Sequence, residues 1–198
     1  MWGGQTDLAQ ALSHVMRERG APGFREFAKK FHVYDINDQD EIAGWMRTEF
    51  PGMAYILALA PPTRDKTEGT YRGVYLTGDE SLTSRAWVGE NVRNRGPLGA
   101  LYPVKTHTVP NPHGCLKEGD TPSWFFFLPL GGNDPRDPSK AGWGGQYERQ
   151  SDGWYRDLPA QPGFDPRTTV RKWRPDFQRD FARRTAWCLP AIGTPAAP

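Results

Sequence analysis

Carboxylates gather around one short segment near the N-terminus. Asp35 lies within residues 32–36, which we predict to form a strand, and Asp38 and Asp40 follow that segment closely. In open α/β sheets a ligand binds at the carboxyl ends of the strands, so these carboxylates are positioned to contact one. The alternative is structural: Asp38 caps the following helix, and Asp40 complements the dipole of that helix.

A second pair of carboxylates precedes the apolar segment 124–130. Asp120 stands directly before Thr121-Pro122, which are typical first residues of a helix. A carboxylate at this position can cap the helix, or it can bind a hard cation such as calcium, which takes several oxygen ligands. Glu118 supplies a second oxygen donor two residues earlier.

Two histidines could take part in acid–base chemistry. His107 and His113 lie in the polar loop before Asp120, where an imidazole either exchanges protons with a substrate or remains solvated. No Walker A, GxGxxG, GxSxG or HExxH motif occurs in the chain. The sequence therefore assigns no catalytic residue.

Aromatic side chains are concentrated in the glycine-rich stretch 131–166. Exposed rings in such a stretch can stack on a sugar, and buried rings can instead hold the long loop against the body of the domain. The candidates are Trp143, Tyr147, Trp154 and Tyr155.

The elements that position these residues alternate over the first 60 positions. We expect a helix that is capped by Thr6 and ends before Gly20, then a short helix containing Phe24 to Phe31. A strand at 32–36, a helix that buries Ile42, Trp45 and Met46, and a buried strand at 53–60 follow. This alternation indicates an α/β domain with a parallel sheet.

The remainder of the chain is less regular. We predict a strand at 73–76, helices beginning at Ser84 and Thr121, and a final helix over 168–187. The 22 glycines and 19 prolines make up about a fifth of the chain, and aromatic residues make up 13%. Such a composition indicates long, ordered loops rather than disorder. We expect one domain over residues 1–187, followed by a linker at 188–198.

Composition also excludes several classes of partner. The net charge is only +2, which argues against a nucleic-acid partner. No apolar segment approaches the roughly 20 residues of a membrane span. The two cysteines, Cys115 and Cys188, have no zinc-site spacing, and whether they pair stays open. The first residues contain no signal-peptide pattern.

Several short motifs occur together in this sequence. They are WGGQTDLAQAL at 2–12, VYDI at 33–36 with QD at 39–40, GPLGALYP at 96–103, EGDTPS at 118–123, NDP at 133–135, GWGGQYE at 142–148, WR at 173–174 and FQRDFA at 177–182. Together they resemble the nucleoside hydrolase-like domain of a bacterial family labelled cellulose-binding, within the inosine–uridine nucleoside hydrolase superfamily.

The resemblance implies a partial nucleoside hydrolase-like, Rossmann-like fold. It also implies that the complete domain hydrolyses the N-glycosidic bonds of nucleoside-like substrates with the help of calcium. It implies that the Thr6 carbonyl and the Asp120 carboxylate hold the calcium and converge beside the loop after Ile36. The candidates for contact with a ribosyl or carbohydrate ligand are Asn37, Gln39, Asp40, Glu118 and Trp143.

The sequence also departs from the superfamily. Gly119 stands where nucleoside hydrolases have a histidine that helps the base to leave. We expect a chain that lacks the first strand of the superfamily with its Asp-rich loop, and lacks the C-terminal β-sandwich. Such a fragment should bind calcium poorly and be inactive, because calcium requires about 6–8 oxygen ligands. The resemblance also points to an extracellular or periplasmic location and allows a homodimer. The alternative function is that of a non-catalytic carbohydrate (cellulose)-binding protein.

Overall fold

The computed structural model describes residues 4–59, 69–104, 116 and 118–189. Its centre is a four-stranded sheet with the order β1-β2-β4-β3. The strands are β1 (His32–Ile36), β2 (Ala54–Ala58), β3 (Tyr147–Arg149) and β4 (Tyr155–Asp157). β1, β2 and β4 run parallel, whereas β3 is antiparallel to β4. The predicted α/β class with a mostly parallel sheet is confirmed.

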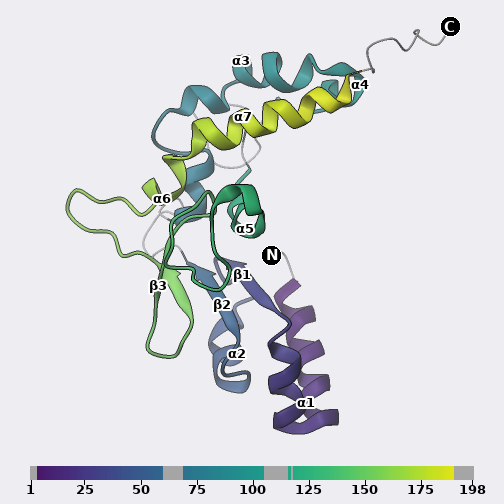
Figure 1. Cartoon of the computed structure of the whole chain (residues 1–198), viewed down its shortest axis with the longest axis vertical. Coiled ribbons are helices and arrows are strands. Elements are labelled where there is room, and N and C mark those ends of the chain that lie inside the picture. Colours follow the sequence, from purple (N-terminus) through teal and green to yellow (C-terminus); the bar gives the residue numbers. More distant parts are fainter. Residues whose placement is uncertain (1–3, 60–68, 105–115, 117, 190–198) are drawn as a thin grey trace, which may run out of the picture.

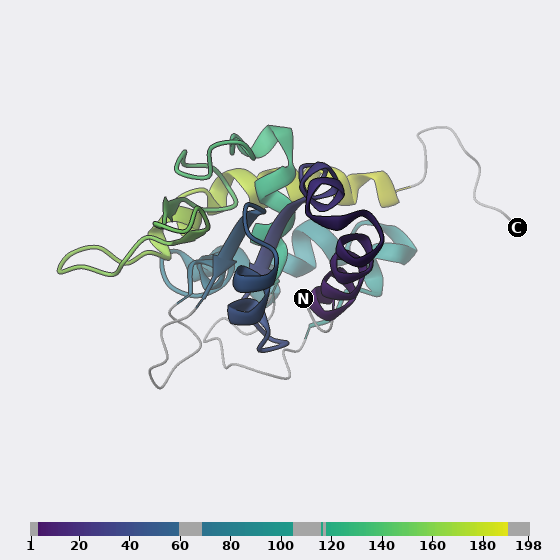
Figure 2. The same cartoon turned by 90° about the horizontal axis from the view of Figure 1, so that it is seen from below.

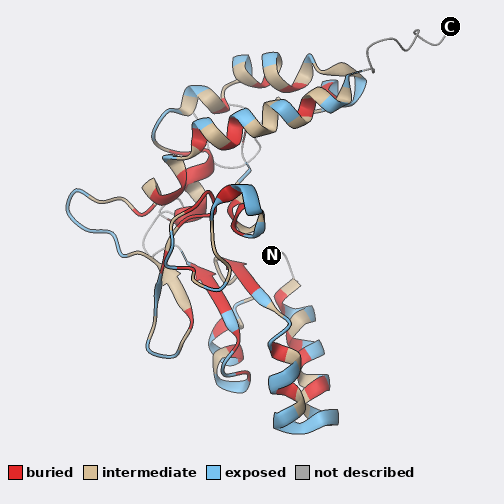
Figure 3. Cartoon of the chain, viewed as in Figure 1, coloured by how far each residue is buried: buried red, intermediate tan, exposed pale blue. Residues whose placement is uncertain are grey.

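Alternating side chains of the strands build a core on each face of the sheet. Val33, Tyr55 and Leu57 face one way and pack with residues of α1 (Gly4–Ala28) and α2 (Ala43–Glu49). Tyr34 and Ile56 face the other way and pack with Phe126 and Tyr147. Figure 3 shows this burial along β1, β2 and the inner side of α1. The sheet is therefore a middle layer between two sets of side chains.

The N-terminal helix contains a kink at Gly20. This glycine has φ 63° and ψ −175°, a conformation that interrupts a helix and that residues with a Cβ rarely adopt. Pro22 follows within the second arm of α1. The helix that was predicted to end before Gly20 therefore continues after a kink, and its two arms run in different directions beside the sheet (Figure 2).

The other elements in the described part of the chain are helices, and turns and irregular segments join them. Helices α3, α4 and α7 lie at the opposite end of the molecule from α1 and α2 (Figure 1). The helices that follow β2 in the chain are η1 (Thr70–Val74), η2 (Glu80–Thr83), α3 (Arg85–Val88), η3 (Gly89–Arg93), α4 (Gly96–Ala100), α5 (Thr121–Phe127), η4 (Pro129–Gly131), α6 (Thr168–Arg171), α7 (Arg174–Thr185) and η5 (Ala186–Cys188). None of the helices described is long and apolar enough to cross a membrane.

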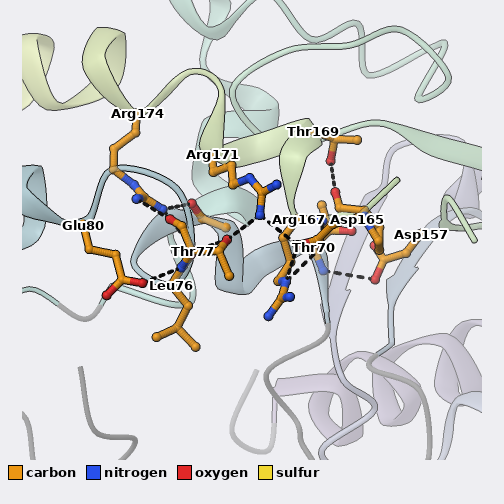
Figure 4. A network of polar contacts seen from close by, with 12 residues as sticks. Thr70, Leu76, Thr77, Glu80, Asp157, Asp165, Arg167, Thr169, Arg171 and Arg174 are labelled. Carbon is orange, nitrogen blue, oxygen red and sulfur yellow. Dashed lines mark hydrogen bonds and ion pairs between the residues drawn. The ribbon is translucent and has the colours of Figure 1, made fainter. Parts of the chain in front are cut away.

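A buried arginine joins α7 to the segment after β2. Arg174 is 1% exposed, and its guanidinium lies among backbone carbonyls rather than against a carboxylate (Figure 4). Burial lowers the pKa of Arg174 to about 10. Its Nε and Nη atoms donate to the carbonyls of Gly73 (2.5 Å), Val74 (3.1 Å), Leu76 (3.2 Å), Thr77 (2.7 Å) and Asp79 (2.9 Å).

That arrangement explains why the strand predicted at 73–76 is wrong. The segment belongs to η1 and the turns after it, and several of its carbonyls accept hydrogen bonds from Arg174. Thr77 and Gly78 then turn the chain with φ of 64° and 67°. The alternation of apolar residues carries no information about a donor that lies about 100 residues away.

Other local predictions are corrected in smaller ways. The helix predicted over 168–187 is divided into α6, α7 and η5, and Pro175 stands in the first turn of α7. Trp45, predicted to be buried, is 47% exposed. Residues 190–198 of the predicted linker lie outside the described residues, as does Cys115, so the pairing of Cys188 stays open.

Arg174→Lys should destabilise the fold by about 2–4 kcal/mol, because lysine cannot donate to all these carbonyls and leaves some of them buried without a partner. Urea unfolding followed by circular dichroism measures the loss. Arg179→Lys, at an exposed position of the same helix, is the control and should change stability by less than about 0.5 kcal/mol. Equal stability of the two variants would contradict the role of Arg174.

Candidate functional site

The parallel strands β1, β2 and β4 end at one edge of the sheet, which we call the carboxyl edge. The loop after β1 begins with Asn37 and Asp38, both in the left-handed region with φ of 69° and 43°. The Asn37 amide donates to the carbonyl of Ala58 at 2.8 Å, which joins the loop to the end of β2. Gln39 Nε2 donates back to the carbonyl of Ile36 at 3.1 Å.

Asp38 has the structural role that the sequence allowed. Its Oδ1 accepts hydrogen bonds from the amides of Ile42 (3.0 Å) and Ala43 (2.9 Å), where α2 begins. These amides have no partner within the helix, so the carboxylate satisfies them and complements the helix dipole.

Asp40 accepts hydrogen bonds at the start of a different helix, α1. Its Oδ2 accepts from the amide nitrogen of Thr6 at 2.8 Å and from Thr6 Oγ1 at 2.9 Å. The structure thereby brings together two of the predicted site residues, one from the first turn of α1 and one from the loop after β1. The sequence indicated that Asp40 complements the dipole of α2, whereas its carboxylate lies at the start of α1.

Asp120 and Glu118 lie at the start of α5, and both are exposed. The Asp120 side chain makes no capping hydrogen bond, and its backbone carbonyl accepts from Ser123 Oγ at 2.7 Å. Glu118 Oε1 accepts from the Tyr102 hydroxyl at 2.5 Å. Among the described residues, no group of three or more histidines, cysteines or acidic residues could hold a metal ion.

A buried carboxylate lies on β1. Asp35 is 1% exposed, and its Oδ2 accepts from Gln5 Nε2 at 2.8 Å and from the Tyr55 hydroxyl at 2.9 Å. Asp35 Oδ1 and Gln5 Oε1 are buried and have no hydrogen-bond partner in the described part of the chain. Burial raises the pKa of Asp35, and the hydrogen bond from Tyr55 opposes this effect.

A second carboxylate, Asp157, ends β4 and lines a pocket of about 390 Å³ at the carboxyl edge. Its Oδ2 accepts from the Thr70 amide at 3.3 Å, whereas its buried Oδ1 has no partner among the described residues. Burial raises the pKa of Asp157 to about 6. Other residues that line the pocket include Leu59, Leu158, Pro159, Phe164, Asp165 and Arg167.

Asp165 is the other carboxylate of this pocket, and its environment is different. It accepts hydrogen bonds from Arg167 Nε at 2.9 Å and from Arg171 Nη1 at 2.8 Å (Figure 4). Burial acts to raise the pKa of Asp165, but the hydrogen bonds and charges of the arginines outweigh it, so the pKa lies below its ordinary value. The pocket thus holds one carboxylate that stays ionised and one that binds a proton near pH 6.

Sequence analysis missed Asp157 and Asp165. β4 contains only three residues, and the surrounding segment is rich in turn residues, so no periodic pattern marked a strand there. The available signal was the aromatic pair Trp154-Tyr155, a residue type favoured in strands, shortly before an acidic residue and Leu158-Pro159.

Three of the four aromatic rings proposed for sugar stacking are buried, namely Trp143, Tyr147 and Trp154, whereas Tyr155 is partly buried. Trp143 is 8% exposed, and its ring packs edge-on against Phe125 with centroids 5.7 Å apart. Trp154 is 2% exposed and stacks on Tyr55 at 3.8 Å. In this structure both rings hold the long loop to the core, so contact of Trp143 with a ligand would require the loop to move. His107 and His113 lie outside the described residues.

Comparison with known proteins gives one match. A family model described as "Cellulose-binding Sde182, nucleoside hydrolase-like domain" matches residues 1–147. Neither the curated proteins nor the solved structures contain a match. Asp157 and Asp165 therefore lie beyond the matched residues.

Asp40→Ala should destabilise the protein by about 1–2 kcal/mol, since the first turn of α1 loses its acceptor. Urea unfolding at pH 7 measures this change. Gln10→Ala, at an exposed position of the same helix, provides the control. If both variants unfold at the same urea concentration as the wild type, Asp40 does not cap α1.

Asp157→Asn should stabilise the protein increasingly as pH rises. Between about pH 4 and pH 6 the folded wild type holds a proton on Asp157 that the unfolded chain has released, so the wild type loses stability over that interval. The loss reaches at most about 3 kcal/mol above pH 6. Urea unfolding of both proteins at pH 4.5 and pH 7.5 tests this, and a difference that does not vary with pH would contradict it.

Proposed function

Because the chain belongs to the family of the nucleoside hydrolase-like domain of cellulose-binding Sde182, we propose that the pocket at its carboxyl edge binds the sugar ring of a nucleoside-like ligand. The location agrees with the general rule for open α/β sheets. Carboxylate, guanidinium and backbone groups in the pocket are suited to the hydroxyls of a sugar.

One observation carries the proposal: the environments of Asp157 and Asp165 in one pocket move their pKa values in opposite directions. Such a separation is typical of paired carboxylates that divide acid and base roles. Asp165 is held ionised by Arg167 and Arg171, so it accepts hydrogen bonds. Asp157 is the group that can carry a proton.

Hydrolysis of an N-glycosidic bond is the reaction that this pair would support. Water adds its oxygen to the anomeric carbon, and the bond from that carbon to the base nitrogen breaks. Asp165, the ionised carboxylate, accepts the proton that the attacking water releases. Asp157 donates its proton to the departing nitrogen, and proton exchange with the solvent then restores both carboxylates. This role would supply the acid that Gly119 cannot, since Gly119 stands where the superfamily has a histidine.

The described residues do not provide a full calcium site. Thr6 donates to Asp40, Asp120 is exposed, and no cluster of three metal-binding side chains lies in the described part of the chain. Calcium at Thr6 and Asp120 therefore remains a prediction from the family resemblance, and no step above depends on it. Asn37, Gln39 and Asp40, at the β1 end of the same edge, remain proposed contacts of the ligand.

A non-catalytic carbohydrate-binding role is the second candidate function. It is favoured by two tryptophans, Trp124 and Trp187, which are 51% and 77% exposed. Both candidates include a sugar ligand, but only the first requires Asp157.

Isothermal titration with inosine, uridine and ribose tests the first candidate. The wild type should bind at least one of them, and Asp157→Asn should weaken binding or slow any base release by about 100-fold with loss of the pH dependence near pH 6. Asp176→Asn, on α7, is the matched control and should behave as the wild type. Absence of binding by the wild type, or equal behaviour of Asp157→Asn, would overturn the proposal.

A further inference from the structure

Two exposed tryptophans lie within cation–π distance of the same arginine. The Cζ atom of Arg184, on α7, is 5.7 Å from the ring centroid of Trp124 and 5.6 Å from that of Trp187. Asp180 Oδ2 holds the same guanidinium by a contact of 2.6 Å to Nε. We call Trp124, Arg184 and Trp187 the Trp–Arg–Trp platform. Both indole rings therefore contact one guanidinium, which Asp180 also contacts.

A pocket of about 400 Å³ adjoins this platform and shares Trp124 and Arg184 with it. Its walls combine apolar side chains, most of them aromatic, with several polar side chains. The aromatic side chains are Tyr102, Trp124, Phe125, Phe177 and Phe181, and the polar ones include Glu118, Gln178, Asp180 and Arg184. This is the pattern of a site for a small uncharged molecule that has both apolar faces and hydroxyl groups.

We propose that the Trp–Arg–Trp platform and the adjoining pocket bind a β-glucan chain of the cellulose type. A pyranose ring has flat C–H faces that pack on indole rings, and its hydroxyls can donate to Glu118 and Asp180 and accept from Arg184. The proposal deepens the second candidate function, on which it rests. It uses neither Asp157 nor the carboxyl-edge pocket.

The charge of the site favours a neutral ligand. The two carboxylates, Glu118 and Asp180, outnumber the single guanidinium of Arg184, so a phosphate or a nucleotide would meet net negative charge. The exposed surface beside the pocket favours a glucan chain over a single sugar. Trp187 is 77% exposed and does not line the pocket, so it adds aromatic surface beyond it. Large exposed aromatic surface of this kind is typical of a binding site.

Retention on microcrystalline cellulose, together with titration by cellohexaose, tests the proposal with the full chain. The wild type should be retained, and Trp124→Ala and Trp187→Ala should each weaken binding by about tenfold, because each removes one stacking surface. Trp187 is so exposed that its replacement should not affect folding. Trp45→Ala, at a 47% exposed tryptophan on α2, is the matched control and should bind as the wild type does.

The outcomes separate this proposal from the proposed functions. Retention that is unchanged in both platform variants overturns the platform and leaves a carbohydrate-binding function elsewhere on the chain. A wild type that is not retained overturns the platform and the second candidate function together. Loss of inosine or uridine binding in the platform variants, with cellohexaose binding unchanged, would show that the pocket takes a nucleoside and would also overturn the proposal. Asp157→Asn should bind cellohexaose normally.

Discussion

The buried guanidinium of Arg174 is the contact on which the second half of the structure depends. A planar cation with five N–H groups satisfies several carbonyls at once, so the turns of segment 73–79 need no strand partner. Arg171, one turn earlier, reaches Thr77 and Asp165 from the same side (Figure 4). These two arginines join α6 and α7 to the segment that carries Thr70, whose amide contacts Asp157. The carboxyl-edge pocket is therefore held in place partly by two arginines that do not line it.

The elements that sequence analysis predicted well are those whose own residues determine them. Strand β2 is an apolar segment of strand length, β1 is a short segment with three apolar residues, and both lie where the pattern placed them. Ser84 caps α3 through a hydrogen bond from the Trp87 amide, as its residue type indicates. In such cases the information is local, because a short segment contains both the signal and the structure.

The elements that were missed depend on distant partners. β4 pairs with β2 through Ile56 and Leu57, about 100 residues earlier in the chain, and its own residues are largely polar. The pKa of Asp157 is raised because the folded chain buries its carboxyl group, so residues 155–157 alone do not predict the shift. Trp143 is a residue that was wrongly expected to be available to a ligand. Its type suits sugar stacking, but its ring packs against Phe125 and Phe177 in the core. Candidate residues were thus identified by type, whereas their roles were decided by tertiary contacts.

The order of the sheet has a consequence for self-association. β1 forms one border of the sheet, and its only strand neighbour in the described part of the chain is β2. Its outward amides and carbonyls are of the kind that recruit another strand, and all of its residues except His32 have buried side chains. Only His32 is exposed on this strand, so a lysine at that position is the one charged substitution in β1 that would oppose the addition of another strand without burying a charge.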